Sequence, residues 1–544
     1  MLRLSRPGAA VLSFALSVIL FSGGCCTGLR QYVQNGFKVG PNYCTPPAPV
    51  ADRWIDAPHI PAAGDPQNIC RWWTVFNDPK LNELVACAYR QNLSLREAGF
   101  RVLQARAQLA IVRGELFPQS QTAFGDYRRV GGAGAPFANA WDYGFRMQWE
   151  LDFWGRLRRA VTEAGDNLDA TVADYDNVLV TLLSDVASNY VRIRTDQERI
   201  RLLQANVELQ RGVLKYVNDR LAAGFHQTPL DSDQALSNLR QTEAGVPLLE
   251  IDVRQSEDAL CVLLGMPTVD LQNLIGAGPI PTSPPQVAIG VPCDLLRRRP
   301  DVRQAERLAA AQAEQIGIAE AQLYPVFTVN GTMGYAASSF RDLFKSSAFN
   351  GSVGPSFQWN VLNYGRIVND VRFQNARFQE LVAAYQRTVL QANADVEDGL
   401  VTFLQSQRRA RLLDESVAAA ERAVKMVLQQ YQTGSVDFNR YVTIEQNMVT
   451  QQDAAAQAHG QIAQGLISTY RALGGGWELR LSGDPGVPQS VMAGPAPGEP
   501  QPTPPPVPAP PAAPTTQPTG HGAGLPPPPN LPIGEQPLWP GNQS

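Results

Sequence analysis

The sequence is poor in charge, histidine and cysteine for its length. Of its 544 residues, 18% are charged, four are histidine and seven are cysteine, and the formal net charge is −4. A nucleic-acid-binding protein needs a basic surface that neutralises phosphates. The slightly negative net charge therefore excludes a nucleic-acid-binding protein. An apolar content of 44% fits neither a largely disordered chain nor a membrane protein of many helices.

Motifs of the common catalytic and metal sites are also missing. The four histidines lie far apart, the cysteines show no paired short spacing, and no phosphate-binding Walker loop or GxSxG motif occurs. The glycine-rich residues 131–134 lie between two alternating segments, where we expect a surface loop. We therefore expect no enzyme, no catalytic residue, no metal site and no cofactor. An exported chain could still oxidise Cys44 with Cys70.

The beginning of the chain has the pattern of an export signal. Two arginines precede an apolar run from Ala9 to Phe21, which is too short for a permanent membrane helix. A cysteine directly after Gly-Gly resembles a bacterial lipobox, although Ser22 stands where leucine is usual. We predict a signal peptide over residues 1–24 and a lipidated N-terminal segment over residues 25–75, with acyl chains on Cys25. The alternative is cleavage nearby, which leaves a free thiol.

Proline is concentrated at the other end of the chain. Of the 43 prolines, 21 lie between Pro485 and Ser544, among Ala, Thr, Gln and Gly. Such a composition cannot bury a core, so we predict a disordered, polyproline-like tail over residues 481–544.

Two copies of one long unit account for most of the chain. Residues 148–156 (QWELDFWGR) match residues 358–366 (QWNVLNYGR) at an offset of 210, and further pairs at offsets near 210 keep the register. We predict repeat 1 over residues 76–280 and repeat 2 over residues 281–480.

Each copy carries a helical stretch, two short alternating segments and a very long helical stretch. The first helical stretch spans Leu81 to Leu116 in copy one and Pro300 to Leu323 in copy two. The long stretch of copy one has no proline from Arg156 to Leu221, and about 65 residues at about 1.5 Å each make a rod of roughly 100 Å. Its apolar residues recur at spacings of four and three, as in a coiled coil, and we expect polar positions such as Gln197 and Gln204 to face a solvated tunnel.

The alternating segments predict two β-hairpins, at about residues 119–152 and 326–361. Large apolar side chains take every second position, and small or polar ones lie between them. A half-buried hairpin of a soluble protein and a transmembrane barrel strand both fit this pattern, and the aromatic residues at the strand ends together with the export signal favour the barrel. The residues expected to face lipid are Tyr143, Phe145, Met147, Trp149, Phe327, Val329, Phe357 and Trp359.

Four strands cannot cross a bilayer as an open sheet, because the edge amides would have no partner in the hydrocarbon. Closure needs several chains, and three would supply twelve strands around an aqueous lumen. The predicted fold class is mainly α with membrane β, with two copies of a helix–hairpin–long helix unit of about 210 residues per chain.

Several ordered motifs resemble those of one known family. They include VGPNY at residues 39–43, WW at 72–73, WELDFWGR at 149–156, LLRRRPD at 295–301 and YRALGGGW at 470–477. Over roughly residues 39–479 the chain resembles the outer-membrane efflux channels of the TolC/OprM-like family, in the branch of NodT-type outer membrane lipoproteins of RND efflux systems.

The resemblance implies a homotrimer in the cell outer membrane, with a twelve-stranded β-barrel, a long periplasmic α-helical barrel and a mixed equatorial region. It implies a passive exit duct for small toxic solutes, joined through a periplasmic adaptor protein to an inner-membrane pump, of the RND class. Outer-membrane lipid would be a further partner, and nucleic acid would not. A type I secretion duct for proteins or peptides is an alternative with the same fold. A third possibility is an envelope coiled coil that forms no channel and tethers the cell wall through its tail.

In this family the periplasmic tip closes where paired helices turn, after a Tyr-x-x-Gly stretch. Here that stretch is residues 431–434, and its counterpart in copy one ends at residue 224. Threefold symmetry would turn each residue near the axis into a ring of three, and an acidic ring selects cations or is neutralised by a cationic neighbour. The alternative is that the acidic residues only cap helices. The predicted gate residues are Asp437, Tyr431, Arg440, Asp231 and Asp233, beside the turn glycines Gly224 and Gly434.

Overall fold

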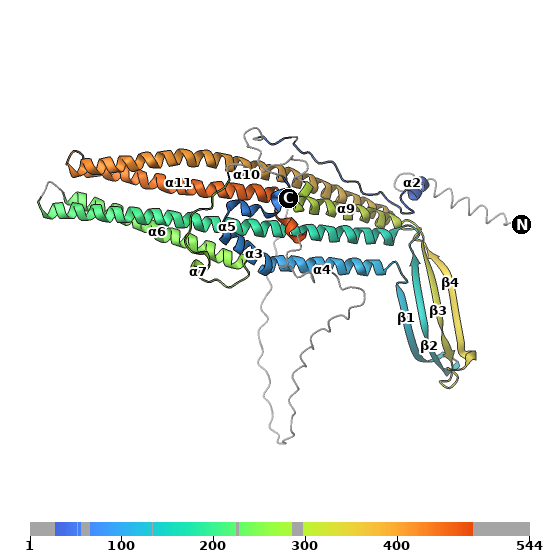
Figure 1. Ribbon diagram of the computed structural model, residues 1–544. Coiled ribbons are helices and arrows are strands. Elements are labelled where there is room, and N and C mark those ends of the chain that lie inside the picture. Colours follow the sequence, from blue (N-terminus) through green and yellow to red (C-terminus); the bar gives the residue numbers. More distant parts are fainter. Residues whose placement is uncertain are drawn as a thin grey trace, which may run out of the picture. The chain divides into compact units, whose positions relative to one another are not determined.

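The computed structural model describes residues 28–51, 53–55, 66–132, 134–224, 228–284 and 297–481. The predicted signal peptide, Cys25 and the predicted proline-rich tail from residue 482 lie outside these residues. Within them the chain is mainly α-helical with one β-sheet, and its two halves repeat the same order of elements (Figure 1). The predicted fold class is confirmed.

In the described residues, both copies contain a 22-residue helix, two strands, one long helix and one shorter helix in this order, and copy one has an additional helix at its start. Copy one contains α3 (Pro79–Gln91), α4 (Leu93–Gly114), β1 (Ser120–Gly132), β2 (Ala135–Leu151), α5 (Arg156–Ala222) and α6 (Pro229–Leu263). Copy two contains α9 (Pro300–Ala321), β3 (Val326–Ala337), β4 (Phe349–Gln358), α10 (Arg366–Gln432) and α11 (Phe438–Ala472). The short elements are α2 (Leu29–Gln34), η2 (Pro66–Phe76), α7 (Gln272–Ile275), η3 (Ser346–Ala348) and η4 (Trp477–Leu481).

The two copies agree in length as well as in order. Helices α5 and α10 have 67 residues each, and α6 and α11 have 35 each. Each long helix begins directly after a glycine with left-handed backbone, Gly155 at φ 83° and Gly365 at φ 81°. Other residues adopt this conformation only with strain, so the same backbone requirement is met at the same place in both copies.

The first helical stretch of copy one differs from the prediction. Instead of one helix over residues 81–116, the chain forms α3 and α4, which are separated at Asn92. The Asn92 side chain accepts a hydrogen bond from the Leu95 amide at 2.8 Å and donates to the Leu263 carbonyl at 2.9 Å. Asparagine favours helix caps over helix interiors because its side chain competes for backbone partners, and this explains the break.

The long helices form two helical hairpins, α5 with α6 and α10 with α11, which lie side by side (Figure 1). The main apolar core lies where α3, α5, α10, α11 and η2 meet, around Trp72, Tyr190 and Phe403. Of the two polar positions predicted to face a solvated tunnel, Gln204 is exposed and Gln197 has a partner in the same chain. Gln197 is half-buried and donates to the Gly276 carbonyl at 3.4 Å, just after α7.

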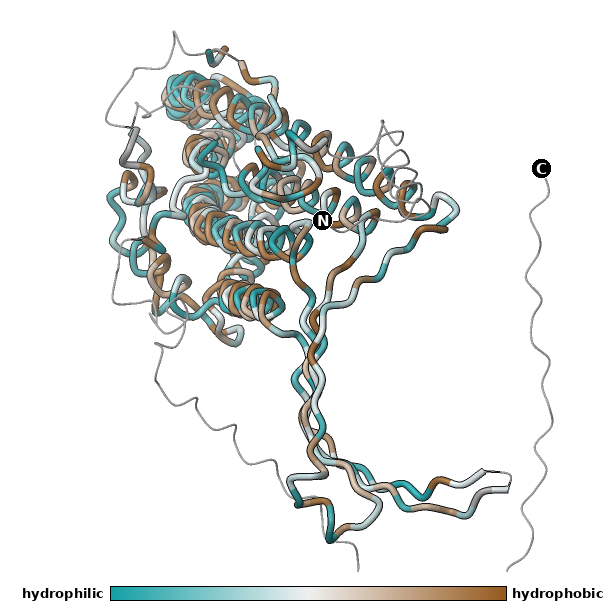
Figure 2. Tube along the Cα trace, turned by 90° about the vertical axis from the view of Figure 1, so that its right-hand side faces the viewer, coloured by the Kyte–Doolittle hydropathy of each residue, from teal (hydrophilic) through white to brown (hydrophobic). Residues whose placement is uncertain are grey.

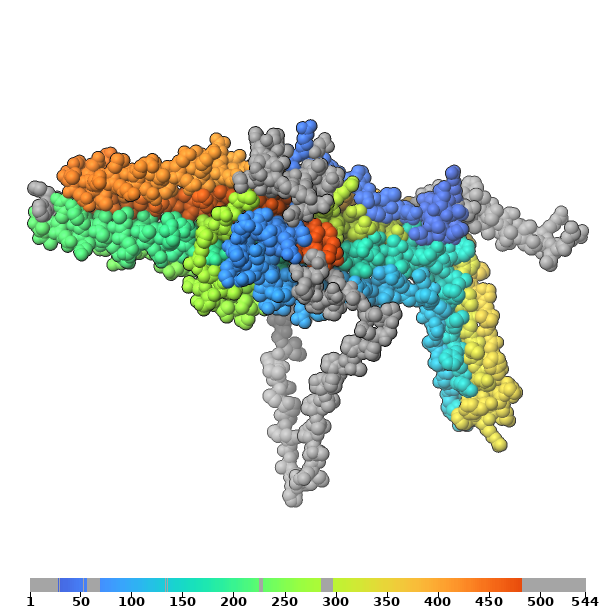
Figure 3. Space-filling view, in the orientation of Figure 1, coloured from blue at the N-terminus to red at the C-terminus, as the bar shows by residue number. Residues whose placement is uncertain are grey.

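The four strands form one antiparallel sheet in the order β1-β2-β3-β4. Strands β2 and β3 pair directly, so the sheet joins the two copies, as the neighbouring cyan and yellow atoms of Figure 3 show. Hydrophobic residues, brown in Figure 2, recur along the strands. Each copy therefore contributes one pair of strands to the sheet, just as it contributes one pair of long helices.

Arg159 on α5 holds the N-terminal VGPNY motif against the helices. Its fully buried guanidinium donates to the carbonyls of Val39 at 2.6 Å and Gly40 at 2.9 Å, and forms an ion pair with Glu314 on α9 at 2.6 Å. A buried ion pair persists only with such a complete set of partners. The motif thus has a structural role at the start of α5.

In the described ranges, no helix is both long enough and apolar enough to cross a membrane. Cys44 and Cys70 are free thiols, so the suggested disulfide between them is wrong.

Candidate gate and membrane-facing sheet

Aromatic side chains pack around the turn between α10 and α11. The ring of Tyr431, at the end of α10, is buried and lies 5.3 Å from the ring of Phe438 and 6.4 Å from that of Tyr441, both on α11. It also lies 6.2 Å from the ring of Tyr216 on α5. Offset and edge contacts at these distances stabilise an aromatic cluster. The predicted gate tyrosine therefore holds its own helical hairpin together and touches the other one.

Arg220 links the two helical hairpins at the same end. Its guanidinium, on the last turn of α5, donates to the Tyr216 hydroxyl at 2.8 Å and to the main-chain carbonyl of Gln432, the last residue of α10, at 3.2 Å. Basic side chains are favourable near helix C-termini, where carbonyls lack partners. Arg220 and Tyr216 are not among the gate residues predicted from the sequence. The available signal was a basic residue in the last turn before Gly224.

The structure places two of the predicted acidic gate residues in helix caps. The Asp437 carboxylate accepts a hydrogen bond from the main-chain N–H of Arg440 at 2.9 Å and caps α11. The Asp231 carboxylate accepts from the amide and the hydroxyl of Thr228, at 3.0 and 3.1 Å, where α6 begins. Both residues therefore stabilise helix starts, which was the alternative interpretation.

The remaining predicted gate residues lie at the surface of the same turns. Asp233 and Arg440 are exposed, and so is Asp437. The turn glycines Gly224 and Gly434 have left-handed backbone, at φ 74° and 79°, and each follows the end of a long helix. Glycine at this position is the common end of an α-helix.

Residues from both copies meet at this tip. Burial raises the pKa of Tyr431 to about 12, and the nearby Asp231 carboxylate contributes to the rise, while Arg220 acts in the opposite direction. The phenol therefore stays protonated over the physiological range. The gate residues predicted separately from α6 and α10 are close enough to interact electrostatically.

A buried carboxylate lies farther along α11. Glu445 is fully buried and accepts hydrogen bonds from the side-chain amides of Gln210 on α5 and Asn238 on α6, both at 2.7 Å. Desolvation raises the pKa of Glu445 above its ordinary value, against the smaller opposing effect of the two amide donors. Helices from both hairpins are thus joined through one titratable group.

The strand register places the predicted lipid-facing residues on one face of the sheet. Seven of the eight share this face, namely Tyr143, Phe145, Met147, Trp149, Phe327, Val329 and Phe357. The exposed fractions are 64% for Phe145 and 70% for Phe357, so the apolar face is uncovered. The other face carries hydroxyl pairs between β3 and β4, such as Thr328 with Ser356 at 2.7 Å. A sheet with these two faces suits a wall between lipid and water.

The prediction that Trp359 is a strand residue is wrong. Strand β4 ends at Gln358, and the Trp359 indole N–H donates to the Leu323 carbonyl at 2.9 Å. In copy one, the Trp149 indole N–H donates to the Leu116 carbonyl at 3.3 Å. In both copies this tryptophan ties the sheet to the turn after the preceding helix.

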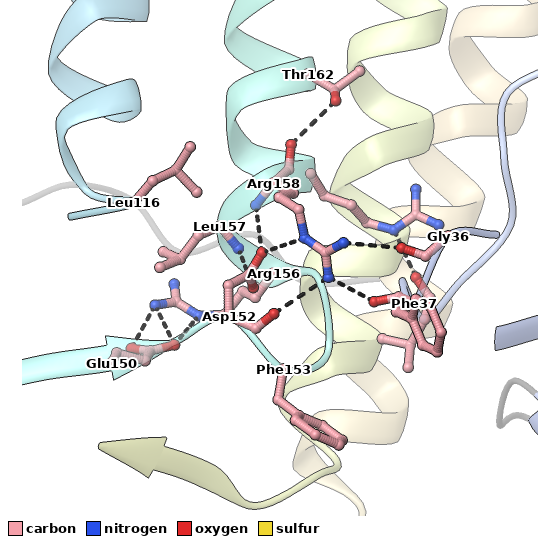
Figure 4. A network of polar contacts seen from close by, with 12 residues as sticks. Gly36, Phe37, Leu116, Glu150, Asp152, Phe153, Arg156, Leu157, Arg158 and Thr162 are labelled. Atoms are coloured by element: carbon pink, nitrogen blue, oxygen red, sulfur yellow. Dashed lines mark hydrogen bonds and ion pairs between the residues drawn. The ribbon is translucent and has the colours of Figure 1, made fainter. Parts of the chain in front are cut away.

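Asp152 fixes the corner between β2 and α5 (Figure 4). Its carboxylate accepts hydrogen bonds from the main-chain amides of Leu157 and Arg158 and from the Arg158 Nε, all at 2.9 Å. The Arg158 guanidinium also donates hydrogen bonds to the carbonyls of Gly36 and Phe37, at 2.9 and 2.7 Å. The corner is therefore tied to the N-terminal segment as well as to the helix.

A second ion pair strengthens the same corner. The Arg156 guanidinium donates to both carboxylate oxygens of Glu150, at 2.8 Å each. Bidentate pairs of this kind add geometric definition to their energy. The equivalent positions of copy two hold Asn360 and Leu362, so copy two cannot form the carboxylate contacts of this corner.

The predicted lipidation residue, Cys25, lies outside the described residues. Among those the structure describes, no group of three or more His, Cys, Asp and Glu side chains is placed to hold a metal ion.

Comparison with known proteins identifies the family of this architecture. The family model described as "Outer membrane efflux protein" matches residues 84–266 and again residues 291–475. The chain belongs to the outer membrane efflux protein family. The two matches fall on the two copies, one on each. The family is one of efflux channels rather than enzymes, and its members lie in the bacterial outer membrane.

This efflux protein is similar to several named outer-membrane proteins. It is 31% identical to the pyoverdine export outer membrane protein OpmQ of Pseudomonas aeruginosa, over 80% of this chain and 94% of that protein. It is 29% identical to nodulation protein T of Rhizobium leguminosarum biovar viciae, over 84% of this chain and 94% of that protein. The solved outer-membrane channel OprN superposes with a TM-score of 0.77 at 30% identity, over 81% of this chain and 99% of that one. The open-state MtrE channel of Neisseria gonorrhoeae shares the fold, with a TM-score of 0.71 at 24% identity, over 80% of this chain and 98% of that one.

Proposed function

We propose that three copies of this efflux protein close into one channel, with a twelve-stranded barrel in the outer membrane and a periplasmic barrel of the long helices. The observation that carries this proposal is the open sheet. In the described part of the chain, β1 and β4 each pair with one strand only, and the apolar face of the sheet is uncovered. Open edges do not persist in hydrocarbon, so neighbouring copies are needed to pair them. Three sheets of four strands supply the twelve.

The channel is proposed as a passive exit duct for small toxic solutes, with no chemistry of its own. A periplasmic adaptor protein and an inner-membrane pump, of the RND class, would supply the cargo and the energy. The relatives support small cargo, because OpmQ is a pyoverdine export protein. The alternative is a duct for secreted proteins or peptides, which would join a type I secretion pump. Crosslinking in cells, followed by identification of the inner-membrane protein that co-purifies, separates the two.

The N-terminal segment is proposed to anchor the channel through lipid on Cys25, after removal of residues 1–24. Helix α2 begins four residues after Cys25, and the hydroxyl of Tyr32 in this helix donates to the Phe153 carbonyl at 2.7 Å, beside the end of β2. This contact supports the anchor, because it holds α2, which follows Cys25 in the sequence, beside the sheet that is proposed to meet the membrane. Residues 25–75 are the lipidated segment of this scheme, residues 76–280 and 281–480 the two repeats, and residues 481–544 the tail.

The tip of the helical hairpins is proposed as the gate. Tyr431 closes the aromatic cluster there, and exposed Asp437 would contribute three carboxylates around a threefold axis, with Asp233 and Arg440 nearby on the same turns. A ring of like charge at a constriction favours cations.

Conductance in planar bilayers tests both the channel and the gate. We expect the reconstituted protein to form pores, and the double variant Asp437→Ala with Tyr431→Ala to conduct more than the parent. Asp437→Asn is the matched control, because asparagine caps a helix as well as aspartate but removes the charge. A change of cation selectivity in Asp437→Asn supports the charged ring. If the conductance of the double variant equals that of the parent, the gate is elsewhere, and if the parent protein is silent, the channel proposal fails.

A further inference from the structure

The segment between β3 and β4, residues 338–348, folds into a compact loop at the end of the sheet that points away from the helices. Its turns are closed by main-chain hydrogen bonds, such as Asp342 N–H to the Ser339 carbonyl at 3.1 Å and Ala348 N–H to the Lys345 carbonyl at 3.0 Å. Leu343 is buried, with 4% of its surface exposed. The backbone of the loop is therefore folded, and its exposed side chains project from a defined turn.

Two phenylalanines of this loop extend the apolar face of the sheet. The ring of Phe340 lies 5.1 Å from that of Trp141, and the ring of Phe344 lies 6.0 Å from that of Tyr143, both on β2. Phe340 and Phe344 also touch each other at 5.5 Å, yet 57% and 64% of their surfaces remain exposed. The rings lie on the face that is proposed to contact lipid, so they form an uncovered aromatic rim at its outer end.

A cation follows each of these phenylalanines directly. Arg341 is exposed, and Lys345 is 61% exposed while its Nζ lies 2.6 Å from the Asp342 carboxylate. Exposed ion pairs of this kind contribute little, so Lys345 can exchange its partner for another anion. Counting Asp342, the loop carries a net charge of +1, and its sequence contains four serines, two before Phe340 and two after Lys345. Aromatic rings beside cations and hydroxyls match the border between acyl chains and phosphorylated head groups.

We propose that this loop binds the phosphorylated glycolipid of the outer leaflet. Phe340 and Phe344 would rest against its acyl chains, while Arg341 and Lys345 hold its phosphates. Arginine suits this task because its planar guanidinium can pair with two phosphate oxygens. The proposal deepens the proposed function, since it rests on the assignment of the apolar face to lipid. It adds a specific lipid partner for the channel and the residues that recognise it.

The test uses the full-length protein, purified in detergent and titrated with lipopolysaccharide. We expect lipopolysaccharide to raise the melting temperature and to stay bound in native mass spectra. The double variant Arg341→Gln with Lys345→Gln should bind at least about tenfold more weakly, the effect of losing one charge-assisted contact or more. The matched control is Arg422→Gln with Lys425→Gln, which removes the same charge from exposed positions on α10.

Three outcomes would overturn the proposal. The first is that the loop variant binds lipopolysaccharide as tightly as the parent does. The second is that the α10 control loses as much affinity for lipopolysaccharide as the loop variant does. The third is that phosphatidylglycerol binds as tightly as lipopolysaccharide, which would indicate general attraction of anions. Treating lipopolysaccharide with phosphatase removes the phosphates that the two cations are proposed to hold. The treated lipid should therefore bind the parent protein only as weakly as untreated lipid binds the loop variant. Conductance in phosphatidylcholine bilayers keeps this test separate from that of the channel. A loop variant that conducts normally and binds glycolipid weakly supports the loop proposal, whereas a silent parent protein would overturn the channel itself.

Discussion

The side-chain amide of Gln210 on α5 donates a hydrogen bond to the carboxylate of Glu445 on α11 at 2.7 Å, across the boundary between the two helical hairpins. Asn238 on α6 donates to the second oxygen of the same carboxylate. Three of the four tip helices are thereby held by one buried group. Its protonation state therefore affects how firmly the hairpins adhere.

We expect Glu445 to make the stability of the protein depend on pH. Its pKa is raised by burial, so the folded state binds the proton more tightly than the unfolded state does. The stabilisation is fully present below the ordinary glutamate pKa and is lost as the pH rises through the raised value. Melting temperatures from pH 4 to pH 8 should therefore fall less steeply for Glu445→Gln than for the parent. The exposed residue Glu415 supplies the control, since Glu415→Gln should keep the parental slope. Identical slopes for Glu445→Gln and the parent would contradict the prediction.

Arg159→Ala should destabilise the protein by about 3–5 kcal/mol, because it leaves Glu314 buried without its partner. The double variant Arg159→Met with Glu314→Met removes both charges, so its free energy of unfolding should fall by less than that of Arg159→Ala. Denaturant unfolding of the protein in detergent measures both. Arg96→Ala on the exposed side of α4 should change stability by less than about 0.5 kcal/mol. A single variant at Arg159 as stable as this control would show that the buried pair contributes nothing.

Asp152→Ala should destabilise the corner between β2 and α5 by about 2–3 kcal/mol, since it removes contacts to two amides and to Arg158. Asp152→Asn keeps an acceptor for the amides and should cost about 1 kcal/mol. The other copy offers the control. Leu362 occupies the equivalent position and is 81% exposed, so Leu362→Ala should be nearly neutral. Equal effects of Asp152→Ala and Leu362→Ala in thermal unfolding would contradict this account.

Cys25→Ser should prevent acylation. The mature parent protein, purified from membranes, is expected to begin at Cys25 and to exceed its calculated mass by the mass of its acyl chains, and the variant should lack this excess. Intact-mass spectrometry measures the difference. A parent protein that carries no added mass would show that the lipobox-like pattern is only a cleavage site.

Local patterns predicted those parts of the structure that depend on spacing along the chain. Alternation located the strands, and the match around residues 148–156 and 358–366 located the starts of both long helices. The break at Asn92 was missed because it is stabilised by Leu263, far away in the sequence. The alternation also continued past the end of β4 to Trp359, since pairing and not hydropathy ends a strand.

The candidate gate was predictable only in part. The turn glycines and the Tyr-x-x-Gly stretch marked the right turns, but sequence alone left open whether Asp231 and Asp437 cap helices. The link from Arg220 to the end of α10 joins residues more than two hundred positions apart. No pattern within one copy could reveal it.

The equal helix lengths of the two copies have a consequence for the wall of the proposed trimer. A chain with one copy would need six subunits to supply the same twelve strands, and all six would be identical. Fusion of two copies lets neighbouring segments of the ring differ while one gene still encodes them all. Around the pore, corners held by the carboxylates of Glu150 and Asp152 in copy one would then alternate with corners of copy two that lack these contacts. The wall would therefore alternate between more rigid and more flexible segments.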